Sequence, residues 1–119
     1  AEARQLAAEN GGSVVESDDR AAALAGSAIV YAKSWSSAEN YGDAAKEREL
    51  RAALAGWCVE ESWFENAPDA RFMHCLPVRR NVVVADAVLD SPRSVVIRQA
   101  HNRLWAQMAV LHRLLAGKS

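Results

Sequence analysis

Short apolar runs alternate with stretches of helical periodicity along this chain. The runs cover residues 13–17 (SVVES), 28–32 (AIVYA), 57–59, 71–75 (RFMHC) and 94–98 (SVVIR). We predict a strand in each run, because the runs are short, rich in β-branched residues and bounded by turn signals. The run at 28–32 shows no alternation of apolar and polar positions, which is typical of a parallel strand buried on both faces.

Four helices are predicted between and beside these runs. The first covers residues 1–10 and ends at Gly11 and Gly12, and the second begins at Asp18 or Asp19 and ends at Gly26. The third runs from about residue 43 to residue 54. The last runs from about residue 99 to residue 115, and its apolar positions recur every three or four residues, so we expect one face to dock on the sheet. These positions are Ala100, Leu104, Met108, Leu111 and Leu115.

The remaining segments are expected to be less regular. Residues 60–68 should form a helical turn that Pro68 breaks, and residues 81–94 should be irregular, with a turn at Ser91 and Pro92. Strands that alternate with helices predict an α/β fold. We therefore expect one domain over residues 1–119, built as a three-layer open sheet of mostly parallel strands with helices on both faces.

Composition narrows the classes of function without choosing one. The chain has 119 residues, a net charge of −1 and 50% hydrophobic residues, which is ordinary for a globular domain. It has no excess of Lys and Arg to support nucleic-acid binding. No apolar run approaches the roughly 20 residues that cross a bilayer, and we find no signal peptide. Two cysteines, Cys58 and Cys75, make no disulfide framework, which fits a reducing compartment. From the charge, the apolar runs and the cysteines together, we expect a cytoplasmic protein that binds neither nucleic acid nor membrane.

The expected sheet places several cationic side chains at one edge. Ligands of open α/β sheets bind beyond the carboxyl ends of the strands. Three segments should meet there: the loop that opens with Lys33, Ser34 and Trp35, the turn over residues 74–79, and the start of the last helix near Arg103. Together with Arg79 and Arg80, these segments predict an edge that binds anions.

His74 and Cys75 leave three interpretations open. A nucleophilic Cys-His pair is geometrically poor, because adjacent residues of a strand point to opposite faces. Alternatively, Cys75 is a small buried hydrophobic residue and His74 a hydrogen-bonded strand end. In the third interpretation His74 donates a hydrogen bond to a substrate oxygen and Cys75 lines the pocket, which the nearby arginines favour. The histidines and cysteines lack metal-ligand spacing, so we expect no metal and no cofactor.

The segment FMHCLPVRRNVVVADAVLDSPRSVVIRQAHNRLWAQMAVL carries a resemblance. With its H-C-L-P signature followed by N-R-L, it resembles the C-terminal segment of the aspartate/ornithine carbamoyltransferase superfamily. Lys33, Ser34 and Trp35, with the paired arginines after H-C-L-P, look like the N-acetylornithine and N-succinylornithine carbamoyltransferases. The resemblance covers about residues 11–115. It implies the Rossmann-like second domain of such an enzyme, in part, without the N-terminal domain that grips carbamoyl phosphate.

The resemblance also implies a reaction and its catalytic groups. A carbamoyl group would pass from carbamoyl phosphate to the side-chain amine of an acylated ornithine, as in arginine biosynthesis. His74 and Arg103 would hydrogen-bond the carbamoyl oxygen. Cys75 and the Leu76 carbonyl would orient the attacking amine and the carbamoyl nitrogen, and Pro77 would fix the turn that exposes this carbonyl.

Further roles and alternatives follow from the same resemblance. Arg79 and Lys33 would hold the carboxylate end of the acylated amino acid, beside Trp35. Gln99 and His101 stand where the superfamily usually has acidic residues. The family is cytoplasmic and usually trimeric, so we expect a homo-oligomer, or self-association through an unpaired sheet edge. We expect no turnover by this chain alone; the alternatives are a non-catalytic binding or interaction module and an ornithine carbamoyltransferase.

Overall fold

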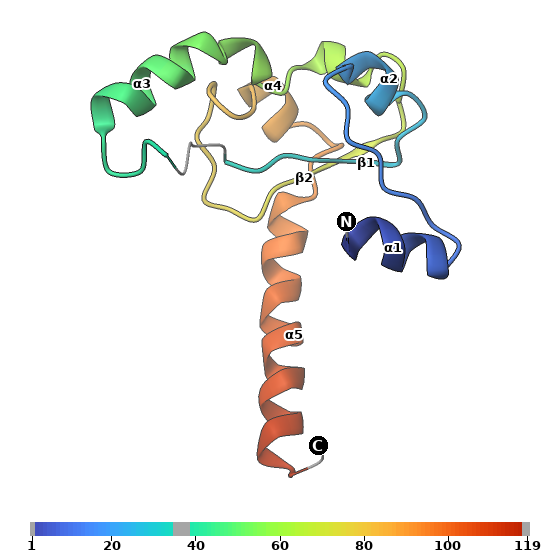
Figure 1. Cartoon of the computed structure of the whole chain (residues 1–119). Helices are drawn as coiled ribbons and strands as arrows, with labels where there is room; N and C mark the ends of the chain where they lie inside the picture. The colour runs from blue at the N-terminus through green and yellow to red at the C-terminus, as the bar shows by residue number, and fades with distance from the viewer. Residues whose placement is uncertain (1, 35–38, 118–119) are drawn as a thin grey trace.

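The computed structural model describes residues 2–34 and 39–117 (Figure 1). Two short parallel strands lie at the centre, and helices lie on both sides of them. In chain order the elements are α1 (Glu2–Glu9), α2 (Arg20–Leu24), β1 (Ile29–Tyr31), α3 (Ala44–Ala53), 3-10 turns at Ala55–Trp57 and Glu61–Phe64, β2 (Arg71–Met73), α4 (Asp86–Leu89) and α5 (Val96–Leu115).

β1 and β2 pair in parallel, as the apolar runs at 28–32 and 71–75 predict. The register places Ile29 opposite Arg71 and Tyr31 opposite Met73. A single parallel bridge joins Phe72 to Ser94 on the other edge of β2. The α/β class is therefore confirmed, and the sheet of the described residues has two strands.

Three of the predicted strands are wrong. Residues 13–17 are exposed and belong to no strand, residues 55–57 form a 3-10 turn, and α5 already begins at Val96. Val59 and Ser94 make only isolated bridges: Val59 pairs with Val84, and Ser94 pairs with Phe72. A strand is stable only where its backbone groups find a neighbour, and the described residues offer the segment at 13–17 no neighbour to pair with.

The predicted helix signals hold better than the strand signals. Asp19 caps α2 by accepting from the Ala22 N–H, and Asp43 caps α3 by accepting from the N–H groups of Ala45 and Lys46. Gly11 follows α1 with φ 73°, a conformation that glycine adopts at little cost. The short helix α4 lies in the stretch that was expected to be irregular.

The core lies against one face of the two strands. Val30, Phe72, Val84 and Val88 are 0–6% exposed, and Phe64 joins them from the second 3-10 turn. Ile29 and Tyr31 point to the opposite face and are 55% and 50% exposed. That face is the side on which α1 and α5 lie in Figure 1.

The prediction that α5 docks on the sheet along its apolar face is wrong. In α5 only Val96 is buried, whereas Leu104, Met108, Leu111 and Leu115 are at least half exposed. Figure 1 shows α5 leaving the body after its first turns. The radius of gyration is 17.5 Å, compared with about 13.5 Å for a compact domain of this length. No described helix, α5 included, is both long and apolar enough to span a membrane.

Candidate functional site

The ends of β1 and β2 bring two predicted site residues together. Lys33 follows β1 by two residues, and Cys75 follows β2 by two residues. Because the strands are parallel, both residues lie beyond the same edge, and the Lys33 Nζ is 3.4 Å from the Cys75 Sγ. Lys33 is exposed and Cys75 is half-buried, so a cation and a thiol meet where this strand edge opens to solvent.

His74 is buried and has one hydrogen-bond donor left over. Its side chain is 1% exposed, and its Nδ1 accepts from the Leu76 N–H at 2.9 Å. In a neutral imidazole the proton must then sit on Nε2. This Nε2 is buried without a hydrogen-bond partner among the described residues. A buried donor of this kind costs free energy unless something accepts from it.

The charge state of His74 follows from its surroundings. Burial lowers the pKa of His74 below 6.5, and the positive charge of Lys33 lowers it further. His74 is therefore neutral at pH 7, and its Nε2–H is available to donate. A neutral ring with its hydrogen on Nε2 can donate a hydrogen bond, and it is not an imidazolium that would act as a general acid at that pH.

The turn that follows His74 has an unusual backbone. Leu76 has φ 49°, in the left-handed region that bulky residues rarely adopt, and the Leu76–Pro77 peptide bond is cis. Leu76 and Val78 pack against the core, while Pro77 is exposed. Packing on both sides of Pro77 therefore holds the Leu76 backbone in a conformation that it would not adopt freely.

The two arginines after the turn have different surroundings. The Arg80 guanidinium donates to Asp86 at 2.6 Å and to Asp90 at 2.7 and 2.8 Å. These contacts raise the pKa of Arg80 and lower the pKa of both carboxyls. The expectation that Arg80 contributes to an anion-binding edge is therefore corrected: its charge is matched by two carboxylates. Arg79 is half-buried in the turn.

Two predicted residues of α5, Arg103 and His101, make no hydrogen bond to this strand edge in the described part of the chain. Arg103 is exposed on α5 and makes no hydrogen bond or ion pair with the described residues. It lies four residues, and so about 6 Å along the axis, beyond Gln99. His101 accepts from the Trp105 indole N–H at 3.0 Å. Trp35 lies outside the described residues.

The residue that links α5 to the strand ends is Gln99. Its Oε1 accepts from the His74 backbone N–H at 3.1 Å, and its Nε2 donates to the Tyr31 hydroxyl at 3.0 Å. The resemblance implies roles for residues of the H-C-L-P and N-R-L motifs, but it implies none for Gln99, which stands where the superfamily usually has an acidic residue. The signal available in the sequence was its position in the first turn of the last helix.

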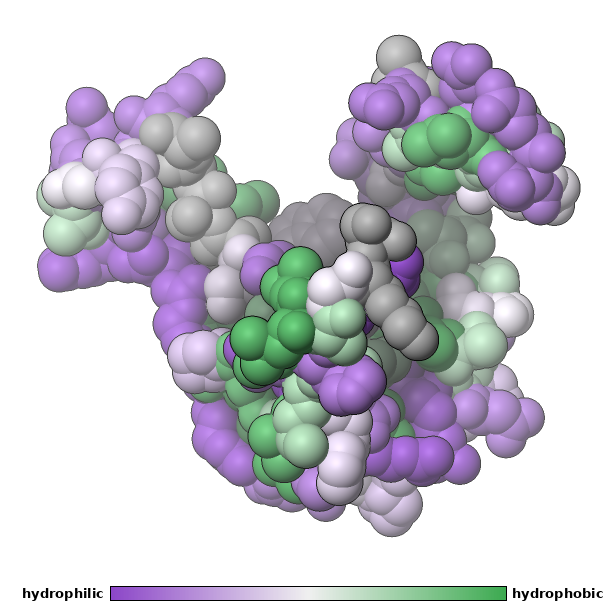
Figure 2. All heavy atoms as spheres, turned by 90° about the horizontal axis from the view of Figure 1, so that it is seen from below, coloured by the Kyte–Doolittle hydropathy of each residue, from purple (hydrophilic) through white to green (hydrophobic). Residues whose placement is uncertain are grey.

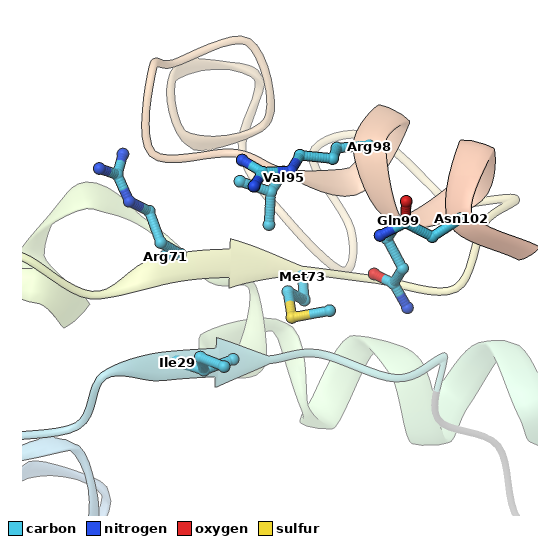
Figure 3. A pocket seen from close by; sticks show the side chains of 7 residues that line it. All are labelled: Ile29, Arg71, Met73, Val95, Arg98, Gln99 and Asn102. Carbon is cyan, nitrogen blue, oxygen red and sulfur yellow. The ribbon is translucent and has the colours of Figure 1, made fainter.

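A cavity of about 280 Å³ lies beside these contacts, between the open face of the strands and α5. Figure 3 shows Gln99 reaching from α5 toward the strands at one side of this cavity. Its walls also include Arg71, Met73, Arg98 and Asn102. None of the predicted site residues that the structure describes lines it. Among the described residues, no group of three or more His, Cys, Asp or Glu side chains is arranged to hold a metal ion.

Comparison with known proteins finds relatives along nearly the whole chain. An N-acetylornithine carbamoyltransferase of Xanthomonas campestris is 41% identical over 95% of this chain and 33% of its own length. An N-succinylornithine carbamoyltransferase of Bacteroides thetaiotaomicron is 39% identical over 98% of this chain and 35% of its own length. An ornithine carbamoyltransferase of Pyrococcus abyssi is 42% identical over 97% and 36%, respectively. The chain thus spans about a third of the length of these relatives.

Solved structures give the same result. Ornithine carbamoyltransferase from Pyrococcus furiosus matches with a TM-score of 0.86 and 40% identity, over 98% of this chain and 37% of that one. An N-acetyl-L-ornithine transcarbamylase mutant, complexed with carbamyl phosphate and N-succinyl-L-norvaline, matches with a TM-score of 0.79 and 41% identity, over 90% and 32%. The family model of the aspartate/ornithine carbamoyltransferase Asp/Orn binding domain matches residues 1–114. This chain therefore belongs to the aspartate/ornithine carbamoyltransferase family, and it matches the amino-acid-binding domain of that family.

Proposed function

We propose that the chain is the amino-acid-binding part of a carbamoyltransferase that acts on N-acetylornithine or N-succinylornithine. The observation that carries this proposal is the buried Nε2–H of His74, which has no partner among the described residues. His74 precedes Cys75, whose Sγ contacts the Lys33 ammonium. A donor held in this way suits an oxygen that gains negative charge during acyl transfer.

The proposed mechanism follows from the charge that develops in the reaction. As the free-base side-chain amine attacks the carbonyl carbon of carbamoyl phosphate, the carbamoyl oxygen becomes negative, and His74 donates a hydrogen bond from its Nε2–H to it. The bond from this carbon to the phosphate oxygen then breaks, phosphate leaves, and the phosphate takes up the proton that the amine loses. Since His74 is neutral, it stabilises this oxygen without giving up a proton. Arg103 supplies a positive charge to the same oxygen once α5 and the substrates are in place. Cys75 and the Leu76 carbonyl orient the amine and the carbamoyl nitrogen, and Pro77 keeps the turn in shape.

We assign the carboxylate end of the amino acid to Lys33 and Arg79, with Trp35 in the same segment. Arginine suits a bidentate grip on a carboxylate, and lysine supplies a point charge. The relatives act on acetylated, succinylated and free ornithine at nearly equal identity, 38–42%, so identity does not select among these substrates. Lys33, Ser34 and Trp35 support an acylated substrate.

We further propose that the chain works together with a part that binds carbamoyl phosphate. Its length, about a third of the curated relatives, supports this division. So do two open surfaces, the edge of β1 that pairs with no strand among the described residues and the exposed apolar face of α5. We propose that this second part covers the face of α5, that residues 1–119 alone do not turn over carbamoyl phosphate, and that the assembly is a cytoplasmic homo-oligomer, a trimer as in the family, serving arginine biosynthesis.

Isothermal titration calorimetry tests this proposal. Acetylornithine, succinylornithine, ornithine and carbamoyl phosphate are titrated into the chain, with and without a separately expressed carbamoyl-phosphate-binding half. We expect an acylated ornithine to bind the reconstituted form more tightly than ornithine does. Equal binding of acylated and free ornithine would contradict the substrate assignment, and binding of none of them would favour a non-catalytic interaction module.

The matched variants are His74→Ala and His112→Ala. Removing the His74 donor should weaken carbamoyl phosphate binding about tenfold, the usual effect of losing one buried hydrogen bond of about 1.4 kcal/mol. His112 is exposed near the end of α5, so its replacement should leave the affinity unchanged. Equal affinities of the two variants would remove His74 from the proposed site.

A further inference from the structure

The Gln99 side chain holds three elements together at one point. It leaves the first turn of α5, where its own N–H donates to the Val95 carbonyl at 2.8 Å. From there its amide bonds the His74 N–H, directly after β2, and the Tyr31 hydroxyl, at the end of β1. Gln99 lies 25 positions from His74 and 68 from Tyr31 along the chain. These two hydrogen bonds, called the Gln99 joint below, therefore form only in the folded protein.

The orientation of the amide is set by its partners. A backbone N–H can only donate, so the group that faces His74 must be the carbonyl oxygen of Gln99. The NH₂ group must then donate to the Tyr31 oxygen, and the hydroxyl proton of Tyr31 remains free to donate elsewhere. Two hydrogen bonds therefore use the carbonyl and the amino group of Gln99 in one fixed direction, and neither could be reversed without losing the other.

The joint fixes His74 from its backbone while a second contact fixes its ring. The Gln99 Oε1 holds the N–H of His74, and the Leu76 N–H holds its Nδ1 at 2.9 Å. With both held, the buried Nε2 has one direction in which to present its hydrogen. Rotation of the ring or displacement of the strand end would break one of these two bonds.

A neutral side chain at position 99 also matters for the charge of His74. Burial and the charge of Lys33 beyond β1 act on the pKa of His74, and the Gln99 amide that bonds its backbone N–H is neutral. A carboxylate in place of the amide would accept from both His74 and Tyr31, and it would favour the imidazolium form. Glutamine supplies the same two contacts without that charge.

We propose that Gln99 is a positioning residue of this site, which ties β1, β2 and α5 together and thereby fixes the neutral His74 with its Nε2–H presented to the substrate. This inference rests on the proposed function for the identity of the substrate. The joint itself is independent of any ligand and can be tested on the chain alone.

The test measures His74 directly by NMR in residues 1–119. Gln99→Met keeps the length of the side chain and removes both hydrogen bonds, and Gln107→Met makes the same change at an exposed position of α5. In Gln99→Met we expect the His74 amide hydrogen to exchange at least about tenfold faster, as for loss of roughly 1.4 kcal/mol of protection. We also expect the Nε2–H tautomer signal of the ring to lose its dominance, with neither change in Gln107→Met.

Two further variants keep the test decisive if Gln99→Met folds poorly. Gln99→Glu retains both contacts and should raise the pKa of His74 in the NMR titration, and Tyr31→Phe should accelerate His74 exchange less than Gln99→Met does. The proposal is overturned if Gln99→Met matches Gln107→Met in exchange and tautomer, or if Gln99→Glu leaves the His74 titration unchanged. Absence of ligand binding would instead contradict the proposed function and leave these readouts intact.

Discussion

At the residue scale, three features of the surroundings of His74 favour the neutral form of its ring. Burial disfavours its charged form, the Leu76 N–H occupies the lone pair that would accept a second proton, and the charge of Lys33 repels one. Each of them favours the neutral ring with hydrogen on Nε2. His74 can therefore donate a hydrogen bond near neutral pH while it keeps its proton.

Replacing Lys33 should therefore change the titration of His74. In Lys33→Met the cationic contribution disappears, so we expect the pKa of His74 to rise, while burial still keeps it below 6.5. NMR titration of the His74 ring protons measures this shift. Lys46→Met is the control, because Lys46 lies on α3 and pairs with Asp43. A midpoint that is the same in Lys33→Met and Lys46→Met would show that Lys33 does not act on His74.

Part of the site could be predicted from single residues and part could not. Lys33 follows one apolar run, and His74 and Cys75 end another, so the rule for parallel strands placed them at one edge. The ion pairs of Arg80 could not be foreseen, because they depend on where Asp86 and Asp90 lie. Asp86 begins and Asp90 follows a helix of only four residues that has no periodic pattern. The Gln99 joint likewise spans three elements.

At the element scale, the segment after the H-C-L-P turn is held by polar contacts. Asn81 has φ 55°, and its side chain accepts from the Asp86 N–H and donates to the Asp86 carboxylate. Arg80 adds bonds to Asp86 and Asp90. These contacts join the two ends of residues 80–90 across α4. They fix the start of α4 relative to the turn, although none of these side chains is buried.

Asp90→Asn tests whether the polar contacts around α4, called the polar anchor here, stabilise the fold. The pKa of Asp90 is lowered by the Arg80 hydrogen bonds, so the ion pair stabilises the fold above the unfolded-state pKa of about 3.9 and loses this effect as the pH falls through the lower folded-state pKa. We expect the variant to unfold at slightly lower urea concentration than the wild type at pH 7, and this difference to vanish in strong acid. Asp18→Asn, at an exposed residue with no ion pair among those described, is the control; identical curves for both variants at every pH would argue against the anchor.

The elements also show why some strands failed to form. Residues 13–17 and 94–98 have the β-branched composition of strands, yet the first belongs to no strand and the second gives way to α5 at Val96. Composition reports a preference for a pleated, half-buried surface, and that surface exists only where a neighbouring strand supplies it. Helix caps act locally, and so the cap of α2 was predicted, with Asp19 as one of the two candidates, as was the start of α3 near residue 43.

At the scale of the whole molecule, α5 is the feature that the compact core does not explain. It has 20 residues and is thus about 30 Å long. Ile97, Leu104, Met108, Leu111 and Leu115 repeat at alternating intervals close to those of a heptad, and all are at least half exposed. Seen from below in Figure 2, hydrophobic side chains gather where α5 projects toward the viewer. A monomeric surface rarely exposes so many large apolar residues in one stripe.

This stripe should drive the isolated chain to associate with copies of itself when no other part covers it. α5 carries Arg98, Arg103 and Arg113 and no carboxylate, so two copies repel each other, and added salt should strengthen their association by screening that repulsion. Sedimentation velocity over a wide range of concentrations, at low and high salt, measures this. We expect Leu104→Gln with Leu111→Gln to shift the chain toward monomer, because each change removes apolar area from the stripe.

The matched control is Leu6→Gln with Val15→Gln. These residues are 53% and 82% exposed and lie outside α5, so their replacement removes exposed apolar surface without altering the stripe. If both double variants shift the association equally, exposed apolar surface in general, and not α5, brings the copies together. If association weakens as salt is added, attraction between charged groups drives it, and the apolar face of α5 loses its role as the contact surface between copies of this domain.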